Sequence, residues 1–441
     1  MEVRAVRGMN DILPDEVGRW QELETAFRVH AELHGFAEVR TPVIEATELF
    51  ARQIGETTDV VEKEMYSFER HDDRLTVRPE GTAGAARAFV EHAVAGQRPV
   101  SRWWYLGPMF RGERPAKGRY RQFWQAGCEH YGDVGPVADA EMIDFVVGFF
   151  QRIGISDLTT HVSSLGSGDT HARFRQAVFD FLAPKRASLS DDSQRRLDKN
   201  PLRILDSKDP RDREAVLGGP SILELLDGDD LAHWNGLRRH LDALGVRYVV
   251  DPTLVRGLDY YTRTLFEVKT SMGDLGAQNT LAGGGRYDNM IEGLGGPKVP
   301  AIGFAMGIER VLSVAPLRAR ERGPVCWVAP MGDAAIDGAL RFARDLRKLG
   351  VAAEVDGRGG KLKAMLRRAE TAGARFCVIF GESELARGVC AVKDLAARTQ
   401  DEVPLEDAAA IVADRIVTPR TAPTEAGAID AGASDAPRGA R

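Results

Sequence analysis

The chain is 441 residues long, which is enough for two or three domains with substantial hydrophobic cores. Its hydrophobic content of 43% and charged content of 28% are typical of a soluble globular protein, and no apolar run approaches a membrane span or a signal peptide. The net charge of −6 excludes a protein coated in positive charge, although a local basic patch can still bind nucleic acid.

The N-terminal part of the chain predicts an α+β arrangement. Helical spacing of apolar residues indicates a helix over 15–34. An apolar strand follows and ends at Pro42, where a residue that cannot donate to a sheet ladder suits a strand edge or an interface. Two more strands are expected at 75–78 and 102–111, with a helix over 82–95 between them.

The middle of the chain changes character. Residues 165–231 are rich in Asp, Arg and Ser and lack strong strand signals, which predicts a small helical insertion. Strand patterns return at 248–251, 259–268 and 303–306. We therefore expect 1–322 to form one α+β domain that contains the insertion.

A boundary is expected at Gly323-Pro324. Beyond it strands and helices alternate, which predicts a compact α/β domain over 324–416 with a mainly parallel sheet. The tail 418–441 is rich in Ala, Pro and Gly, so it buries too little apolar surface to offset its ordering entropy and we expect disorder.

The cysteines and histidines show no metal-binding or disulfide pattern. Cys128, Cys326, Cys377 and Cys390 are scattered and form no C-x-x-C pair, so we expect free buried thiols and a cytoplasmic location. The nine histidines lack a spacing such as H-E-x-x-H, and we expect no metal held by the protein itself.

The most informative segment is Tyr105–Gly132. Strand-like residues with interleaved aromatics flank a short loop, which predicts an antiparallel hairpin. The charged side chains that gather there are Arg111, Glu113, Arg114, Lys117, Arg119, Arg121 and Glu129. Because arginine holds phosphate by planar, bidentate contacts, the loop indicates a site for a nucleotide, a nucleic acid or both. The alternative is a solvated charged hairpin, which the interleaved aromatics disfavour.

Several segments together carry a family resemblance: RPEGTAG at 78–84, the hairpin, LVRGLDYYTRTLFEV at 254–268 with GGGRYD at 283–288, and AIGFAMGIERVL at 301–312. They resemble the histidyl-tRNA synthetase family, a branch of the class II aminoacyl-tRNA synthetases. The hairpin matches the second motif of the class, GFAMGIER the third, and the segment ending at Pro42 the first, while RGLDYYTRT and GGRYD are peculiar to the histidyl branch. The resemblance extends from Arg7 to about Ile416. It implies a class II antiparallel sheet flanked by helices, followed by an anticodon-binding α/β domain.

The resemblance implies a two-step reaction in which ATP is a substrate, accompanied by Mg²⁺. The carboxylate of histidine joins the α-phosphate of ATP and releases pyrophosphate, and the histidyl group then passes to the 3′ end of tRNA(His). Arg111 and Arg256 are the implied catalytic residues, because Arg111 would stabilise charge on the α-phosphate and Arg256 would hold the histidine carboxylate. The implied ATP-binding residues are Arg111, Glu113, Arg119, Arg121, Phe123 and Arg310.

The same resemblance implies a pocket that reads histidine. Its members would be Glu80, Gly81, Thr82, Gln125, Glu129, Arg256, Tyr260, Tyr261 and Tyr287. An imidazole offers a donor and an acceptor on opposite nitrogens, so a carboxylate and a hydroxyl can read it.

Contacts with tRNA are implied at two places. Lys117 lies in the hairpin loop, and Lys361, Lys363, Arg367 and Arg368 lie on a basic helix of the C-terminal domain. Ala116 stands in the loop where many family members carry a polar amide, so the reading of the tRNA acceptor end stays open. The class also implies a homodimer formed through the segment around Pro42, and no membrane partner.

Other interpretations stay open at this point. Arg256 could belong to a plain strand-entry turn, GGGRYD to a loop without a ligand, Glu80 to a helix cap, Tyr260 to a core, and the basic helix to an ordinary amphipathic surface. For the whole chain, the main alternative is a regulatory subunit of ATP phosphoribosyltransferase. Such a subunit senses histidine without catalysis and typically lacks the C-terminal domain. A plain RNA-binding module explains the basic patches but leaves the histidine-binding set without a role.

Overall fold

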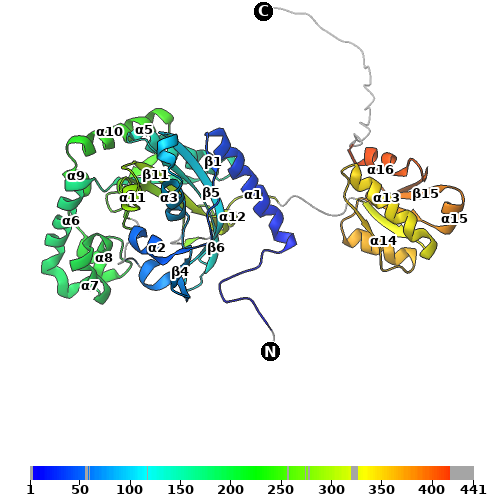
Figure 1. The fold of residues 1–441 in the computed structure, drawn as a ribbon, viewed down its shortest axis with the longest axis horizontal. Helices are drawn as coiled ribbons and strands as arrows, with labels where there is room; N and C mark the ends of the chain where they lie inside the picture. Colours follow the sequence, from blue (N-terminus) through cyan, green and yellow to red (C-terminus); the bar gives the residue numbers. More distant parts are fainter. Residues whose placement is uncertain are drawn as a thin grey trace, which may run out of the picture. The chain divides into compact units, whose positions relative to one another are not determined.

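The computed structural model describes residues 3–54, 58, 60–116, 118–255, 258–273, 275–276, 279–318 and 326–417. It divides into two compact units, Met1–Arg320 and Glu321–Arg441 (Figure 1). The predicted boundary at Gly323-Pro324 and the predicted tail lie outside the described residues, as do Lys117 and Arg256.

The described strands of the first unit include a sheet of eight, in the order β1-β5-β6-β11-β10-β9-β7-β8. Its strands are β1 (Ala37–Glu38), β5 (Ser101–Phe110), β6 (Gln122–Tyr131), β11 (Ala301–Gly307), β10 (Thr280–Arg286), β9 (Thr262–Thr270), β7 (Leu158–Ser164) and β8 (Tyr248–Val250). The interior pairs are antiparallel, and the two edge pairs, β1 with β5 and β7 with β8, are parallel. The predicted antiparallel sheet is thus confirmed, with parallel edges added. GGGRYD, for which a loop was an alternative, supplies most of the interior strand β10.

Long helices cover this sheet, and their apolar side chains pack on it to form the hydrophobic core. The helix predicted over 15–34 is α1 (Pro14–Leu33), which begins with a proline in its first turn and two acidic residues that suit the helix dipole. Its buried Phe27 lies edge-on to Trp104 of β5 and to Phe149 of α5 (Pro136–Arg152). Helix α5 packs across β9, β10 and β11. Burying each such aromatic side chain contributes about 1.5–3 kcal/mol, so this helix layer holds the sheet rigid beneath the site.

The first unit also contains a second, smaller sheet. Strands β2 (Ile44–Ala46), β4 (Asp73–Val77) and β3 (Tyr66–Arg70) form a three-stranded antiparallel sheet. It is followed by α3 (Thr82–Glu91) and α4 (Val94–Gln97), so the helix predicted over 82–95 is two helices. Other short helices among the described residues of the first unit are α2 (Thr47–Ile54), η1 (Val60–Glu64), α11 (Met290–Gly293) and α12 (Ile308–Leu312).

The helical insertion is present and longer than expected (Figure 1). It contains α6 (Gly168–Leu182), η2 (Ala183–Ser188), α7 (Asp191–Lys199), η3 (Pro201–Ile204), α8 (Pro210–Val216), α9 (Ile222–Leu225) and α10 (Gly228–Leu244). The predicted end at residue 231 is wrong, because α10 continues to Leu244 and packs on α5. Buried Asp212 organises the insertion by accepting hydrogen bonds from the hydroxyls of Ser190, Ser193 and Ser207, at 2.7, 2.7 and 2.5 Å.

The second unit is described over 326–417 and has its own hydrophobic core. Its elements are β12 (Cys326–Pro330), η5 (Asp333–Ala335), α13 (Ile336–Lys348), β13 (Ala353–Val355), α14 (Leu362–Thr371), β14 (Phe376–Phe380), α15 (Glu382–Ala386), β15 (Val389–Asp394), β16 (Thr399–Pro404) and α16 (Ala408–Val417). In this sheet β12 pairs in parallel with β13 and β14, whereas β15 pairs antiparallel with β14 and β16. The predicted mainly parallel sheet is therefore wrong for its second half. The sequence analysis missed β16, an edge strand whose side chains are mostly exposed.

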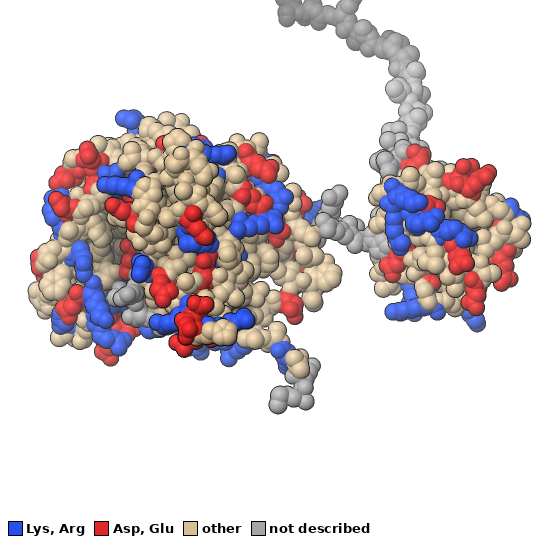
Figure 2. All heavy atoms as spheres, viewed as in Figure 1, with Lys and Arg blue, Asp and Glu red and all other residues tan. Residues whose placement is uncertain are grey.

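All four cysteines lie in the described part of the chain, where they are buried and free, as predicted. Within the same residues, no helix combines the length and the apolar character needed to cross a membrane. Positive and negative side chains are interspersed over the faces shown in Figure 2, in keeping with the modest net charge of −6.

Candidate active site

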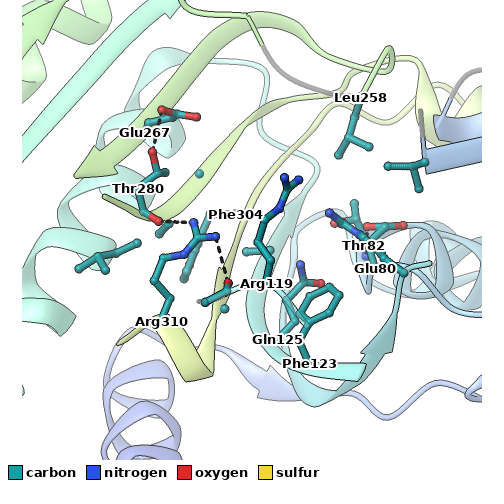
Figure 3. A pocket seen from close by; sticks show the side chains of 18 of the residues that line it. Glu80, Thr82, Arg119, Phe123, Gln125, Leu258, Glu267, Thr280, Phe304 and Arg310 are labelled. Carbon is teal, nitrogen blue, oxygen red and sulfur yellow. Dashed lines mark hydrogen bonds between the residues drawn. The ribbon is translucent and has the colours of Figure 1, made fainter. Parts of the chain in front are cut away.

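A cavity of about 380 Å³ opens on the main sheet and collects most of the predicted site residues. Those that line it are Glu80, Thr82, Arg111, Glu113, Arg119, Phe123, Gln125, Tyr260, Tyr261, Tyr287 and Arg310. Figure 3 shows Arg310 and Thr280 on one side, Glu80 and Thr82 on the opposite side, and Arg119, Gln125 and Phe123 between them. Segments far apart in the sequence thus converge on one space.

The hairpin of β5 and β6 supplies one wall of the cavity. Arg111 follows β5, its Nε donates to the carbonyl of Pro79 at 2.9 Å, and its guanidinium carbon lies 5.3 Å from the ring centre of Phe123. Such cation–π contact and the hydrogen bond fix the plane of the guanidinium before any ligand arrives. Nearer the hairpin tip, Arg119 forms an ion pair with Glu113. The wall therefore presents pre-oriented donors to an anionic ligand.

Arg121, also predicted to reach ATP, does not line this cavity. Its Nε donates to the carbonyl of Glu113 at 3.2 Å and its Nη1 to that of Arg7 at 3.4 Å. Its backbone N–H donates to the carbonyl of Gly8 at 2.7 Å. The structure thus uses Arg121 to attach the N-terminal segment to the hairpin.

A second wall, on the side of the cavity opposite Glu80 and Thr82, is built around the ends of β9, β10 and β11 and by α12. Arg310 donates from Nη1 to the carbonyl of Thr280 at 2.6 Å and from Nη2 to that of Gly118 at 3.5 Å (Figure 3). The hydroxyl of Thr280 donates in turn to Glu267 at 3.1 Å. The sequence analysis missed both residues, because Thr280 lies outside the predicted motifs and Glu267, although it lies within the segment 254–268, carried no predicted role. The pairing of β9 with β10 brings them together.

Two further charged residues, Glu309 and Lys208, line the cavity, and the sequence analysis did not name them as site residues. Both carboxylate oxygens of Glu309 accept from the backbone N–H of Trp124, at 2.9 and 3.1 Å, and burial raises the pKa of Glu309 to about 7. Lys208 comes from the insertion and lines both this cavity and an adjoining one of about 750 Å³. Only the packing of the insertion against the hairpin could reveal Lys208.

Glu80 both caps a helix and lines the cavity. Its carboxylate accepts from the backbone N–H groups of Thr82 and Ala83, at 2.7 and 2.8 Å, at the start of α3. Burial raises its pKa, against the lowering effect of these backbone bonds and of Arg111. Next to it, the N–H of Gly81 donates to Oε1 of Gln125 at 3.1 Å. The interpretation of Glu80 as a helix cap is thus confirmed, and Glu80 also lines the cavity.

Glu129 lies directly beneath the cavity floor and has no exposed surface. Tyr287 donates to one of its oxygens, and Tyr105 donates to the other at 3.2 Å. Burial raises the pKa of Glu129 to about 8, while the Tyr287 hydrogen bond works in the opposite direction. Gly303 of β11 covers this carboxylate, since a Cβ there would lie 1.8 Å from a Glu129 oxygen.

Three tyrosine rings complete this end of the cavity. The ring centres of Tyr260 and Tyr261 lie 4.6 Å apart, and those of Tyr260 and Tyr287 lie 5.7 Å apart. Tyr260 is partly exposed and lines the cavity, and it also packs against the buried clusters that contain Tyr261 and Tyr287, so it serves as core packing as well as cavity wall. Arg256, which would complete this set, lies outside the described residues.

The predicted tRNA-binding residues of the second unit divide into two groups. Lys361, Lys363 and Arg367 are exposed on or beside α14. Arg368 is instead only partly exposed, and its Nε donates to Asp356 at 2.8 Å and its Nη2 to the carbonyl of Gly359 at 2.7 Å. Arg368 therefore stabilises the loop before α14.

Comparisons with known proteins agree with this geometry. Residues 8–311 match the family described as histidyl-tRNA synthetase, and residues 325–415 match the anticodon binding domain. The chain belongs to the histidyl-tRNA synthetase family.

Relatives in this family are similar over nearly their whole length. A histidine–tRNA ligase of Sorangium cellulosum is 68% identical over 415 residues, which cover 94% of this chain and 97% of the relative. A histidine–tRNA ligase of Geobacter sulfurreducens is 45% identical, with 91% of this chain and 97% of the relative covered. The crystal structure of the apo histidyl-tRNA synthetase of S. aureus is 32% identical with a TM-score of 0.79, covering 93% of this chain and all of that one.

Membership of the histidyl-tRNA synthetase family confirms the family, fold class and enzyme class predicted from the sequence. The regulatory-subunit alternative is not favoured, because the anticodon-binding match covers 325–415, the region such subunits typically lack.

Proposed function

We propose that this cavity activates histidine with ATP to form histidyl-adenylate, and then transfers the histidyl group to the 3′ end of tRNA(His). The observation that carries the proposal is the buried carboxylate of Glu129, held by two tyrosine hydroxyls under a cavity whose wall carries Arg111. A buried carboxylate and nearby hydroxyls suit an imidazole, and a pre-oriented guanidinium suits a phosphate. This pairing supports a site for an amino acid and a nucleotide together.

In the first step, the histidine carboxylate attacks the α-phosphate and pyrophosphate leaves. Arg111 would donate hydrogen bonds to the α-phosphate oxygens as their charge grows, and Arg256 would hold the attacking carboxylate. Phe123 and Arg310 would lie on opposite faces of the adenine, with Glu113 accepting from its amino group. Arg119 would contact the outer phosphates, and Mg²⁺ would accompany ATP, bound chiefly to phosphate oxygens.

Histidine would be read by groups on the other side of the cavity. Glu80, Thr82 and Gln125 would hold its α-amino group, and Gly81 orients Gln125 by the hydrogen bond already described. Glu129 and Tyr261 would bracket the imidazole, supported by Tyr260 and Tyr287. A site built on such hydrogen bonds can reject an analogue that lacks them by roughly 10⁴–10⁵.

We further propose that the second unit, over 324–416, binds the anticodon loop. Lys361, Lys363 and Arg367 would contact RNA phosphates, while Arg368 would contribute indirectly through the loop that it holds. Lys117 would contact the acceptor end of the tRNA. A homodimer through the segment around Pro42 and a cytoplasmic location belong to the same proposal, the latter supported by four free thiols.

Exchange of labelled pyrophosphate into ATP tests the first step without tRNA. We expect exchange that requires histidine, and its absence with folded protein would refute the proposed chemistry. Truncation after residue 322 is expected to retain exchange and to lose tRNA charging, whereas equal loss of both would contradict the division between the units. Light scattering tests the dimer, and a monomeric mass would contradict it.

A further inference from the structure

We propose that the helical insertion positions Tyr260 and Tyr261 of the histidine site. It does so through polar contacts to the residues that flank them, Asp259 and Arg263, within the segment Leu258–Arg263. The inference rests on the proposed role of the cavity in binding histidine. Leu258, Tyr260 and Tyr261 line the cavity, whereas the residues that tie their segment to the insertion do not.

The first contact holds the segment at Asp259. Asn200 Nδ2 donates to Asp259 Oδ1 at 3.1 Å, and Arg203 Nε lies 3.4 Å from the same oxygen. Asn200 follows α7 and Arg203 lies in η3, so both belong to the insertion. The side chains of Arg203 and Asp259 are only 14% and 27% exposed, so solvent screens this ion pair less than a pair on the open surface.

The second contact holds the segment at Arg263. Its Nε donates to Asp230 of α10 at 2.8 Å, and these side chains are 16% and 6% exposed. Asp230 also accepts from the backbone N–H and hydroxyl of Ser167, at 2.9 and 2.7 Å, immediately before α6. The carboxylate of Asp230 thus links α10, the start of α6 and the segment Leu258–Arg263.

The backbone of Arg263 has a conformation that is unfavourable for an arginine. Its φ is +44°, in the left-handed region that a residue other than glycine rarely adopts. The sheet register is irregular there, because Gly285 pairs with Leu265 while Arg286 pairs with Thr262. Bulges of this kind redirect side chains next to functional sites. Here the bulge directly follows Tyr260 and Tyr261.

A second cavity adjoins Tyr261 on the side of the insertion. Leu258 and Tyr261 both line this cavity of about 270 Å³, whose opposite wall is formed by insertion residues that include His171 and Leu202. Tyr261 also packs in one apolar cluster with Leu165, Leu254 and Leu265, and the polar contacts at Asp259 and Arg263 add to this packing in setting the position of the segment. A shift of this segment would disturb the histidine half of the cavity and leave Arg111, Phe123 and Arg310 in place.

The test compares Michaelis constants in histidine-dependent pyrophosphate exchange. Arg203→Ala and Arg263→Ala are each expected to raise KM for histidine about tenfold, the size of one charge-assisted hydrogen bond, with KM for ATP changed less than twofold. Arg203→Lys should recover most of the affinity, because it restores a cation near Asp259. The matched control is Arg195→Ala on α7, whose 74% exposed side chain pairs only locally with Asp192. This control should leave both constants unchanged.

Either of two results would overturn the inference. One is an unchanged KM for histidine in both folded alanine variants. The other is an equal rise of both Michaelis constants, which indicates general disruption of the cavity. If an arginine variant does not fold, Asn200→Ala removes the hydrogen bond that an uncharged amide donates to Asp259. A rise in its KM for histidine alone then supports the inference, and an unchanged value overturns it. Exchange by the unaltered protein tests the proposed function separately, so failure of the inference and failure of the function are distinguishable.

Discussion

The hydroxyl of Tyr287 donates a hydrogen bond to the carboxylate of Glu129, and no part of Glu129 is exposed to solvent. The two residues are 158 positions apart in the chain. Strands β10 and β6 bring them together, because both pair with β11 and lie on either side of it. Tyr287 lines the proposed histidine pocket and Glu129 lies directly beneath its floor, and the burial of Glu129 makes the pair testable through the pH dependence of stability.

Glu129→Gln should change how stability depends on pH. Burial raises the pKa of Glu129 from 4.5 to about 8, so between these values the unfolded chain releases a proton that the folded protein retains. The free energy of unfolding of the unaltered protein therefore falls as pH rises through this window, and the glutamine variant lacks that contribution. Denaturant unfolding at pH 5 and pH 8 should show the variant gaining roughly 2–4 kcal/mol relative to the unaltered protein. Parallel pH profiles would contradict the raised pKa.

Gly303→Ala should destroy the histidine pocket. A Cβ at this position would lie 1.8 Å from a Glu129 oxygen and 2.7 Å from the carbonyl of Cys128, so backbone as well as side chain must move. We expect a loss of at least 1–3 kcal/mol of stability, in the range of overpacked cores, together with loss of histidine-dependent exchange. Gly96→Ala, where a Cβ meets nothing within 4 Å, is the control and should retain exchange. A fully active Gly303→Ala variant would disprove the packing argument.

Arg111→Ala should slow adenylate formation far more than it weakens histidine binding. Removing one pre-oriented donor to a developing anionic charge costs about 10²–10³ in turnover. Arg111→Lys should recover little, because an ammonium cannot keep both the planar contact with Phe123 and the bond to Pro79. Arg114→Ala removes an exposed arginine of the same hairpin that does not line the cavity, and exchange should be unchanged. Pre-steady-state adenylate formation measures the difference, and an equal effect of both alanine variants would contradict the assignment.

Lys208→Ala should raise KM for ATP about three- to tenfold. Lys208 is exposed and lines both cavities, so in the proposed complex its charge would attract the outer phosphates of ATP, which Arg121 would not contact. An exposed cation is screened by salt, so the difference from the unaltered protein should shrink between 50 mM and 500 mM salt. Arg211→Ala, which removes a cation of the adjoining cavity that pairs with Asp209, is the control. A salt-independent effect would argue against a Coulombic role.

The double variant Lys363→Ala/Arg367→Ala should weaken tRNA binding without changing exchange. Both side chains are exposed on one side of α14, and each lost phosphate contact should lower the slope of log affinity against log salt by about 0.7–0.9. Arg368→Ala should act differently, by lowering the stability of the second unit, because it leaves the buried carboxylate of Asp356 without its cation. Filter binding over a salt series and thermal unfolding separate the two effects. An unchanged slope in the double variant would exclude α14 from the RNA contact.

Local patterns were sufficient for most of the fold. Helix α1 lies one residue from its predicted position, because helical periodicity and an N-terminal proline act within a few turns. Edge strand β16 was not predictable, since TQDEVP lacks an apolar alternation and becomes a strand only by pairing with β15. The glycines of GGGRYD read as a loop, whereas at Gly284 a Cβ would lie 2.2 Å from the carbonyl of Gly303 on the neighbouring strand. Such a close approach between two strands leaves no mark in the local sequence.

The residue types and their order along the chain determined the family, the hairpin as the phosphate-facing element, and most members of the cavity. Tertiary structure alone decided which of these side chains reach the cavity. It turned Arg121 toward Arg7 and Arg368 toward Asp356, and it brought Lys208 and Glu267 to the cavity wall. The physical reason is that a motif specifies chemistry within a few residues. The direction of a side chain and the pKa of a buried carboxyl such as Glu129 depend on atoms contributed by distant strands and by the insertion.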